Sequence, residues 1–256
     1  MNKMKCFLFI LSVLVLCIGC QRRGGNYSNR VVSQSSSNQR VSSSASDRHR
    51  PSTSVATDNT SVSLPSSRNS SKTYTGAEIF ARYSSAVFMV YTSNGWNEFQ
   101  GSGFFINSSG LAVSNYHVFK GTGVGLETIK LANGTKCKLK SVVAKSSEYD
   151  FILFYVDIPG TCNYIPVSNR QSKVGEKVFT IGSPRGLENT FSSGEISQLR
   201  GNYVIQINAP IDHGSSGGVL INEYGEAIGI TSSGYDDSSA NLNFALDIQV
   251  VKPYIR

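Results

Sequence analysis

The stretch DHGSSGGVLINEYGEAIGIT, residues 212–231, joins a glycine-rich loop to two short apolar segments. These segments, 218–221 and 227–231, are separated by polar residues and a glycine. Short apolar runs bounded by turn residues are typical of β-strands. The stretch therefore predicts two short strands that directly follow a loop.

The same pattern of short strands and turns extends over the whole chain from residue 73 onward. Asn133-Gly134, between expected strands at 125–131 and 136–143, is the strongest hairpin signal. Further strands are expected at 86–91, 98–106, 111–114, 151–156, 177–181, 194–199, 204–209 and 243–246. Helix is scarce: a capping box of Thr75 and Glu78 opens a short helix over 75–82, and another is expected over 248–254. The pattern predicts an all-β fold, with a length that suits two small barrels.

The charge of the chain is concentrated before this region. Residues 1–72 hold 10 Lys/Arg and 2 Asp/Glu, a net of +8, whereas residues 73–256 hold 14 and 15, a net of −1. The predicted globular part therefore has no basic excess of the kind that binds phosphates, and we expect no nucleic-acid partner. The sequence divides into a leader at 1–19, a linker at 20–72 and a folded domain at 73–256.

The leader has the features of an export signal. Two lysines precede the apolar run Phe7–Gly19, which is too short to span a bilayer. The run ends in Cys17-Ile18-Gly19-Cys20 and resembles a bacterial lipobox, although Cys17 stands where leucine is usual. The resemblance implies cleavage before Cys20 and lipidation of Cys20, which would anchor the protein to a membrane. An ordinary signal peptide is the alternative.

The linker at 20–72 is rich in serine and lacks apolar periodicity. Such a segment buries too little surface to offset its chain entropy, so we expect a disordered spacer. Gln21, which follows the lipidated cysteine, lacks the acidic group that can signal retention in an inner membrane. Its absence favours the outer membrane.

Two cysteines lie in the predicted domain. A hairpin through residues 146–149 would bring Cys137 near residue 158, where Cys162 can reach it. An exported compartment permits disulfides, so we consider a Cys137–Cys162 disulfide, with two free thiols as the alternative. The spacing of Cys and His suggests no metal site, and no cofactor is expected.

Three segments carry residues suited to nucleophilic catalysis. They contain His117, Asp150 and Ser216, in that order along the chain. A serine hydroxyl is a weak nucleophile that needs a neighbouring base, and histidine titrates near neutral pH. A carboxylate holds the imidazole in the required tautomer and stabilises the imidazolium. These three residues are therefore the predicted catalytic triad.

The other histidines and the nearby aspartates are less suited to these roles. His49 lies in the linker, and His213 directly adjoins the glycine-rich loop. Asp157 ends a strand, and Asp212 lies on the nucleophile's own loop. Asp150 is preferred because the apolar residues after it would hold its carboxylate at the seam of a barrel.

The glycines around Ser216 allow its backbone to approach a substrate closely. The amides of Gly214 and Ser216, with Ser215 between them, are predicted to form an oxyanion hole. A substrate pocket is predicted from residues before the loop and on the strand after it: Pro210, Ile211, Ile230, Thr231 and Ser232. None of the five is charged, so cleavage after small or medium aliphatic residues such as Val or Ala is expected.

The segments 101–117, 149–155, 175–197 and 207–248 resemble trypsin-like proteases of the HtrA/Deg branch. Within them, Ile181-Gly182-Ser183-Pro184 and Gly225–Ile230 look like segments of that branch before and after its nucleophile. The resemblance implies a double antiparallel six-stranded β-barrel with the triad in the cleft between the barrels. It also implies a serine endopeptidase acting on extracytoplasmic proteins or peptides.

Two features depart from the pattern of that branch. Ser215 stands where Asn usually precedes the nucleophile, and we expect no PDZ domain because the sequence stops at Arg256. A homo-trimer is left open. A catalytically silent binding module of the same fold is the alternative function. A purely structural surface lipoprotein would leave the glycine-rich loop and the context of His117 unexplained.

Overall fold

The computed structural model describes residues 71–123, 125–183, 186–187, 189–201, 203–234 and 242–255. The predicted signal peptide, the lipidation site at Cys20 and the linker up to residue 70 lie outside the described residues, as does Pro184. Within the described ranges, no helix has the length and hydropathy needed to cross a membrane.

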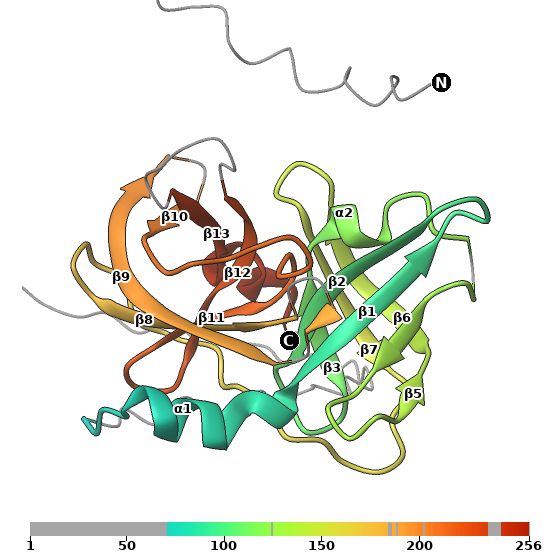
Figure 1. Cartoon of the computed structure of the whole chain (residues 1–256), viewed down its shortest axis with the longest axis horizontal. Coiled ribbons are helices and arrows are strands. Elements are labelled where there is room, and N and C mark those ends of the chain that lie inside the picture. The colour runs from blue at the N-terminus through green and yellow to red at the C-terminus, as the bar shows by residue number, and fades with distance from the viewer. Residues whose placement is uncertain are drawn as a thin grey trace, which may run out of the picture. The chain divides into compact units, whose positions relative to one another are not determined.

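The first half of the described chain forms one antiparallel sheet (Figure 1). Its strands are β1 (Val87–Ser93), β2 (Glu98–Phe105), β3 (Leu111–Ser114), β4 (Thr128–Lys130), β5 (Lys136–Cys137), β6 (Leu139–Ser146) and β7 (Phe151–Val156). They are arranged in the order β5-β4-β1-β2-β3-β7-β6.

The predicted strand over residues 136–143 is interrupted once, at Lys138. This residue alone lies between β5 and β6, which occupy opposite edges of the sheet. The chain therefore passes directly from one edge of the first sheet to the other at this point. The Lys138 ammonium group donates to the carbonyl oxygens of Gly125, at 2.8 Å, and Glu127, so it holds the loop before β4.

The second half forms a closed barrel of six strands. They are β8 (Lys177–Gly182), β9 (Thr190–Arg200), β10 (Val204–Ile207), β11 (Val219–Asn222), β12 (Ala227–Gly234) and β13 (Asn243–Asp247). Their order around the barrel is β10-β13-β12-β11-β8-β9. The predicted all-β fold with few helices is confirmed.

Helices are short and lie outside the sheets. The helix α1 (Gly76–Tyr83) begins at the predicted capping box, in which the Thr75 hydroxyl accepts from the Glu78 amide and the Glu78 carboxylate accepts from the Thr75 amide. The other helical segments are the 3-10 helix η1 (Ser84–Ala86), α2 (Tyr116–Phe119), and the 3-10 helices η3 (Ile248–Val250) and η4 (Lys252–Tyr254). The predicted helix 248–254 is split because Pro253 has no N–H to continue an α-helical ladder.

Three apolar clusters fill the described fold. One lies in the first sheet and includes Phe88, Phe105 and Phe154, and one lies in the second barrel and includes Ile205 and Leu220. The third cluster takes residues from both sheets and from α1 and therefore packs the two halves together.

The strand β11 is buried along its whole length. Val219 and Ile221 belong to the cluster shared by both sheets, whereas Leu220, between them, belongs to the interior of the second barrel. Because successive side chains of a strand point to opposite faces, both faces of β11 must be apolar. This explains the uninterrupted apolar run after the glycine-rich loop, and it fixes the end of that loop to the core.

Candidate active site

His117 and Asp150 meet where β3 and β7 lie side by side. β3 pairs with β7 so that Ser114 is opposite Ile152, which brings together two segments 33 residues apart. The His117 Nδ1 atom lies 2.7 Å from Asp150 Oδ2, and the His117 amide donates to Asp150 Oδ1 at 2.8 Å. The His117 side chain is 47% exposed and that of Asp150 is 32% exposed. With Nδ1 facing the carboxylate, the Nε2 atom is the ring nitrogen left to exchange a proton with a substrate group.

The backbone of Asp150 adopts a left-handed conformation, with φ of 56°. Its carbonyl oxygen accepts hydrogen bonds from the Asn115 side chain at 2.9 Å and from the Tyr116 amide at 3.2 Å. The next residue, Phe151, is fully buried and begins β7. Asp150 is therefore held at its carboxylate and at its carbonyl by the short segment that carries His117.

Asn115 contacts Asp150 directly, although the sequence pattern assigned it no role. It is fully buried, directly precedes α2, and its amide group donates to the Asp150 carbonyl. Asn115 lies two residues before His117 in the sequence. Its partner Asp150 lies far along the chain, and only the pairing of β3 with β7 brings the two together.

Ser216 lies on the loop between β10 and β11, close to the segment that carries His117. Gly101 lies between the two segments. A Cβ atom at Gly101 would lie 2.7 Å from the Val118 methyl groups and 3.1 Å from the Ser216 carbonyl oxygen. Only a glycine allows β2, the residue after His117 and the Ser216 loop to approach this closely.

The Ser216 hydroxyl donates a 2.5 Å hydrogen bond to the Ser232 carbonyl oxygen on β12. Among the described residues this is the hydrogen bond that its Oγ atom makes, so the hydroxyl faces β12 and is not bonded to His117. The structure thus contains the histidine–aspartate pair, with the serine hydroxyl turned to a different acceptor.

The backbone of the loop divides its amides into two groups. The Ser215 amide donates to the Asp212 carbonyl at 2.9 Å, and the Gly217 amide donates to the Thr231 carbonyl at 2.8 Å. The amides of Gly214 and Ser216 have no acceptor within the described part of the chain. Gly214, at a φ of 94°, also requires a conformation that glycine tolerates best. Of the three residues predicted for the oxyanion hole, Ser215 has its amide engaged inside the loop.

The predicted substrate pocket is only partly accessible. Ile230 is fully buried in the cluster between the two sheets, so the prediction that it lines the pocket is wrong. Thr231 is 1% exposed, and its hydroxyl donates to the Ser215 carbonyl at 2.7 Å. Its side chain is therefore hydrogen-bonded to the nucleophile loop and does not face a substrate. The shared cluster covers Ile230 and the nucleophile loop covers Thr231, on a strand that lies between β11 and β13. Pro210 is exposed, and Ile211 and Ser232 are partly exposed.

Both cysteines of the described domain are free thiols, so the predicted disulfide is not formed. The predicted hairpin does place Cys137 near residue 158, since Leu139 is opposite Val156. Cys162, however, is held at the turn after β2, where its amide donates to the Ser108 carbonyl and its thiol to the Asn107 carbonyl. Burial is the main cause that raises the pKa of both thiols.

We expect both thiols to react slowly with iodoacetamide in the folded protein at pH 8. A raised pKa leaves less of the reactive thiolate at a given pH, so the rate should climb as the pH increases and should jump on unfolding in urea. Mass spectrometry of the peptides that contain Cys137 and Cys162, without reductant, measures this. Recovery of the two peptides linked to each other would contradict the structure.

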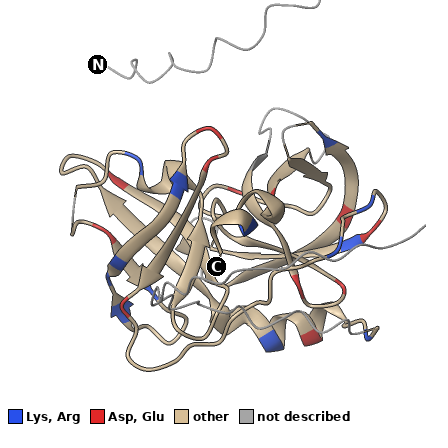
Figure 2. Ribbon diagram, turned by 180° about the vertical axis from the view of Figure 1, so that it is seen from behind, with Lys and Arg blue, Asp and Glu red and all other residues tan. Residues whose placement is uncertain are grey.

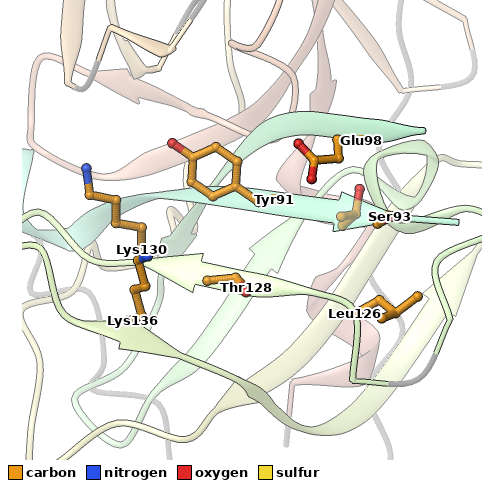
Figure 3. A pocket seen from close by; sticks show the side chains of 8 residues that line it. Tyr91, Ser93, Glu98, Leu126, Thr128, Lys130 and Lys136 are labelled. Atoms are coloured by element: carbon orange, nitrogen blue, oxygen red, sulfur yellow. The ribbon is translucent and has the colours of Figure 1, made fainter. Parts of the chain in front are cut away.

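Basic and acidic residues alternate along the ribbon of the described domain (Figure 2). A cavity of about 410 Å³ lies against the first sheet, and none of His117, Asp150 and Ser216 lines it. Figure 3 shows the side chains that line it, which come from β1, β2, β4, β5 and the loop before β4: Tyr91, Thr92, Ser93, Glu98, Leu126, Thr128, Lys130 and Lys136. Among the described residues, no group of three His, Cys, Asp or Glu side chains is placed to hold a metal ion.

Comparison with known proteins finds peptidases. Protease Do-like 1, chloroplastic, of Arabidopsis thaliana is 36% identical over 163 residues, which are 59% of this chain and 36% of that protein. The probable periplasmic serine endoprotease DegP-like of Rhizobium meliloti (strain 1021) is 32% identical over 61% of this chain and 32% of its own length. The chain therefore spans about a third of the length of these curated relatives.

A solved structure and a family model agree with these relatives. The crystal structure of the serine endoprotease from Yersinia pestis matches with a TM-score of 0.63 at 26% identity, over 70% of this chain and 65% of that one. A family model described as the trypsin-like peptidase domain matches residues 101–230, about half of the chain and the part that carries His117, Asp150 and Ser216. The chain belongs to the trypsin-like peptidase domain family.

Proposed function

We propose that the chain is a serine endopeptidase of the HtrA/Deg type, with His117, Asp150 and Ser216 as its catalytic triad. The observation that carries the proposal is the 2.7 Å contact between His117 and Asp150 beside a glycine-rich loop that bears Ser216. The similarity to Do-like and DegP-like proteases supports it.

The first chemical step requires the Ser216 hydroxyl to turn from Ser232 to His117. His117 Nε2 then takes the hydroxyl proton as Oγ attacks the carbonyl carbon of the substrate. Asp150 keeps Nδ1 protonated and stabilises the imidazolium that forms. His117 returns the proton to the leaving amine, and water repeats the sequence to release the acyl group from Ser216.

The negative charge that develops on the substrate oxygen is stabilised by the amides of Gly214 and Ser216. Both lack an acceptor among the described residues, whereas the amide of Ser215 is engaged with Asp212. Two fixed amides in the loop cost no reorganisation when the charge appears, and each such donor contributes about 3–4 kcal/mol in enzymes of this kind.

The substrate backbone is proposed to pair with the Ser232 carbonyl. The pairing of β12 with β13 shifts register between Thr231 and Gly234, and Ser232 falls within this interruption. A substrate N–H that takes this carbonyl would displace the Ser216 hydroxyl, which is then free to face His117. Substrate binding thereby promotes the reactive orientation of the nucleophile.

Cleavage is proposed to follow small or medium aliphatic residues, with Pro210, Ile211 and Ser232 at the edge of the pocket. Asp212 is the acidic residue on the nucleophile loop, and its Oδ1 atom accepts from the amide of its neighbour His213 at 2.7 Å. None of Pro210, Ile211 and Ser232 is charged, which supports a preference for uncharged residues.

The test is to incubate the purified full chain with an unfolded protein and to map the cuts by mass spectrometry. We expect internal cuts that follow Val or Ala and that a fluorophosphonate inhibitor blocks. A lack of cleavage together with a lack of labelling by the inhibitor would favour a silent binding module. Cuts confined to Arg or Lys would refute the proposed specificity alone.

Export and a lipid anchor at Cys20, with the outer membrane favoured, are part of the same proposal. The short apolar leader, the lipobox-like residues and the periplasmic names of several relatives support it. Mass spectrometry of the mature N-terminus should find acyl chains on Cys20, and an unmodified thiol there would refute the anchor. Light scattering of the purified protein would decide whether it forms a trimer.

A further inference from the structure

The hydroxyl of Ser102 connects the first sheet to the loop that bears the nucleophile. Ser102 lies on β2 within the motif Gly101-Ser102-Gly103 and is fully buried. Its Oγ atom donates to the Gly214 carbonyl at 2.8 Å and accepts from the Ser183 amide at 2.9 Å. One buried hydroxyl therefore links β2, the loop after β8 and the nucleophile loop.

The backbone of Ser102 makes further contacts with the same loop. Its amide donates to the Ser216 carbonyl at 2.8 Å, and its carbonyl oxygen accepts from the Ser114 hydroxyl at 2.7 Å. A Cβ atom on Gly217 would lie only 2.1 Å from that carbonyl oxygen, so Ser102 and Gly217 are in close contact. Ser102 thus binds the loop on both sides of Ser215.

These contacts fix the peptide unit between Gly214 and Ser215. Its oxygen accepts from Ser102, and its N–H donates to the Asp212 carbonyl. Because a peptide unit is planar, it cannot rotate without breaking both hydrogen bonds. The amides of Gly214 and Ser216 flank this unit on either side, so its orientation decides whether they point the same way.

We propose that Ser102 is a positioning residue for the oxyanion hole, which acts by holding the Gly214 carbonyl in place. The inference rests on the proposed function, because it assigns a cause to the orientation of the two amides. Ser102 does not touch the substrate in this role. Its removal should therefore reduce the rate of the chemical step and leave substrate binding nearly unchanged.

The test compares Ser102→Ala with Ser168→Ala in the full chain. Ser168 is equally buried, and its hydroxyl also donates one hydrogen bond, to the Glu226 carboxylate at 2.8 Å, and accepts another, from the Arg170 amide at 3.1 Å. We expect Ser102→Ala to lower kcat and the rate of fluorophosphonate labelling by about 10- to 100-fold, with KM changed less than about twofold. Ser168→Ala should lower the melting temperature to a similar extent and leave kcat unchanged.

Hydrogen exchange provides a readout that does not depend on turnover. Exchange of the peptide covering residues 212–217 should be faster in Ser102→Ala than in the parent protein and unaltered in Ser168→Ala. If Ser102→Ala does not fold, Ser102→Cys, which retains a weak donor, replaces it and should show an intermediate loss of kcat.

The outcomes separate this inference from the proposed function. If the parent protein is labelled and the folded Ser102 variants match it in kcat and exchange, the inference is overturned and the peptidase assignment stands. An equal loss of kcat in Ser168→Ala would also overturn it, since general destabilisation would explain both. If fluorophosphonate does not label the parent protein, both this inference and the proposed function are refuted.

Discussion

Replacement of Ser216 by alanine is expected to lower kcat by about 10⁶-fold, the largest effect of any single substitution in this chain. Alanine removes the Oγ atom that attacks the substrate, and His117 and Asp150 then have no hydroxyl to activate. The residual rate should come from substrate binding and the amides of Gly214 and Ser216 alone. Turnover of an unfolded protein substrate and labelling by a fluorophosphonate both measure the loss.

The matched control is Ser193→Ala, which removes an exposed serine on β9. It should leave kcat and labelling unchanged. A double variant with His117→Ala should be no slower than Ser216→Ala, because residues that act as a unit are not additive. Persistent labelling of Ser216→Ala would place the nucleophile elsewhere and would disprove the proposed triad.

Replacement of Asp150 by asparagine is expected to lower kcat by about 10⁴-fold with little loss of stability. The amide group of asparagine favours the tautomer of His117 in which Nε2 already carries a proton, so the imidazole cannot accept one from Ser216. The left-handed φ of 56° at residue 150 is one that asparagine tolerates, and Asn189 already adopts a φ of 53° in this chain. The Asp150 carbonyl should keep its hydrogen bonds to Asn115 and Tyr116.

Asp150→Ala provides the contrast, because alanine in the left-handed region adds backbone strain. It should lower both kcat and the melting temperature, whereas Asp150→Asn should lower kcat alone. Calorimetry and steady-state kinetics on the same preparations distinguish the two. A fully active Asp150→Asn would show that another group orients His117.

Local pattern predicted the elements best where both faces of a strand are buried. The strands expected at 111–114 and 151–156 coincide with β3 and β7. In both strands, successive side chains alternate between the cluster of the first sheet and the cluster shared with the second barrel. Such runs are apolar throughout and end sharply at polar residues, so their limits are visible in the sequence.

The elements that sequence reasoning missed depend on contacts from far along the chain. α2 has four residues and too little length for helical periodicity, and it is held by the hydrogen bonds that join His117 and Tyr116 to Asp150. Lys138, at the interruption between β5 and β6, donates to two carbonyl groups in the loop before β4. Neither partner is a sequence neighbour, so no local pattern reveals the element.

The sequence by itself determined the fold class and the three residues proposed for the triad, because strand periodicity and the chemistry of Ser, His and Asp are local properties. Only the tertiary structure decided which residues near the loop are accessible: it buried Ile230 and bonded the Thr231 hydroxyl to the Ser215 carbonyl. Only the structure, too, decided that Cys137 and Cys162 are free thiols. It also placed the Ser216 hydroxyl on Ser232 and the Ser102 hydroxyl on Gly214. The burial of a side chain and the identity of its hydrogen-bond partners depend on which strands pair across the fold. The sequence of one strand does not reveal which strands pair with it.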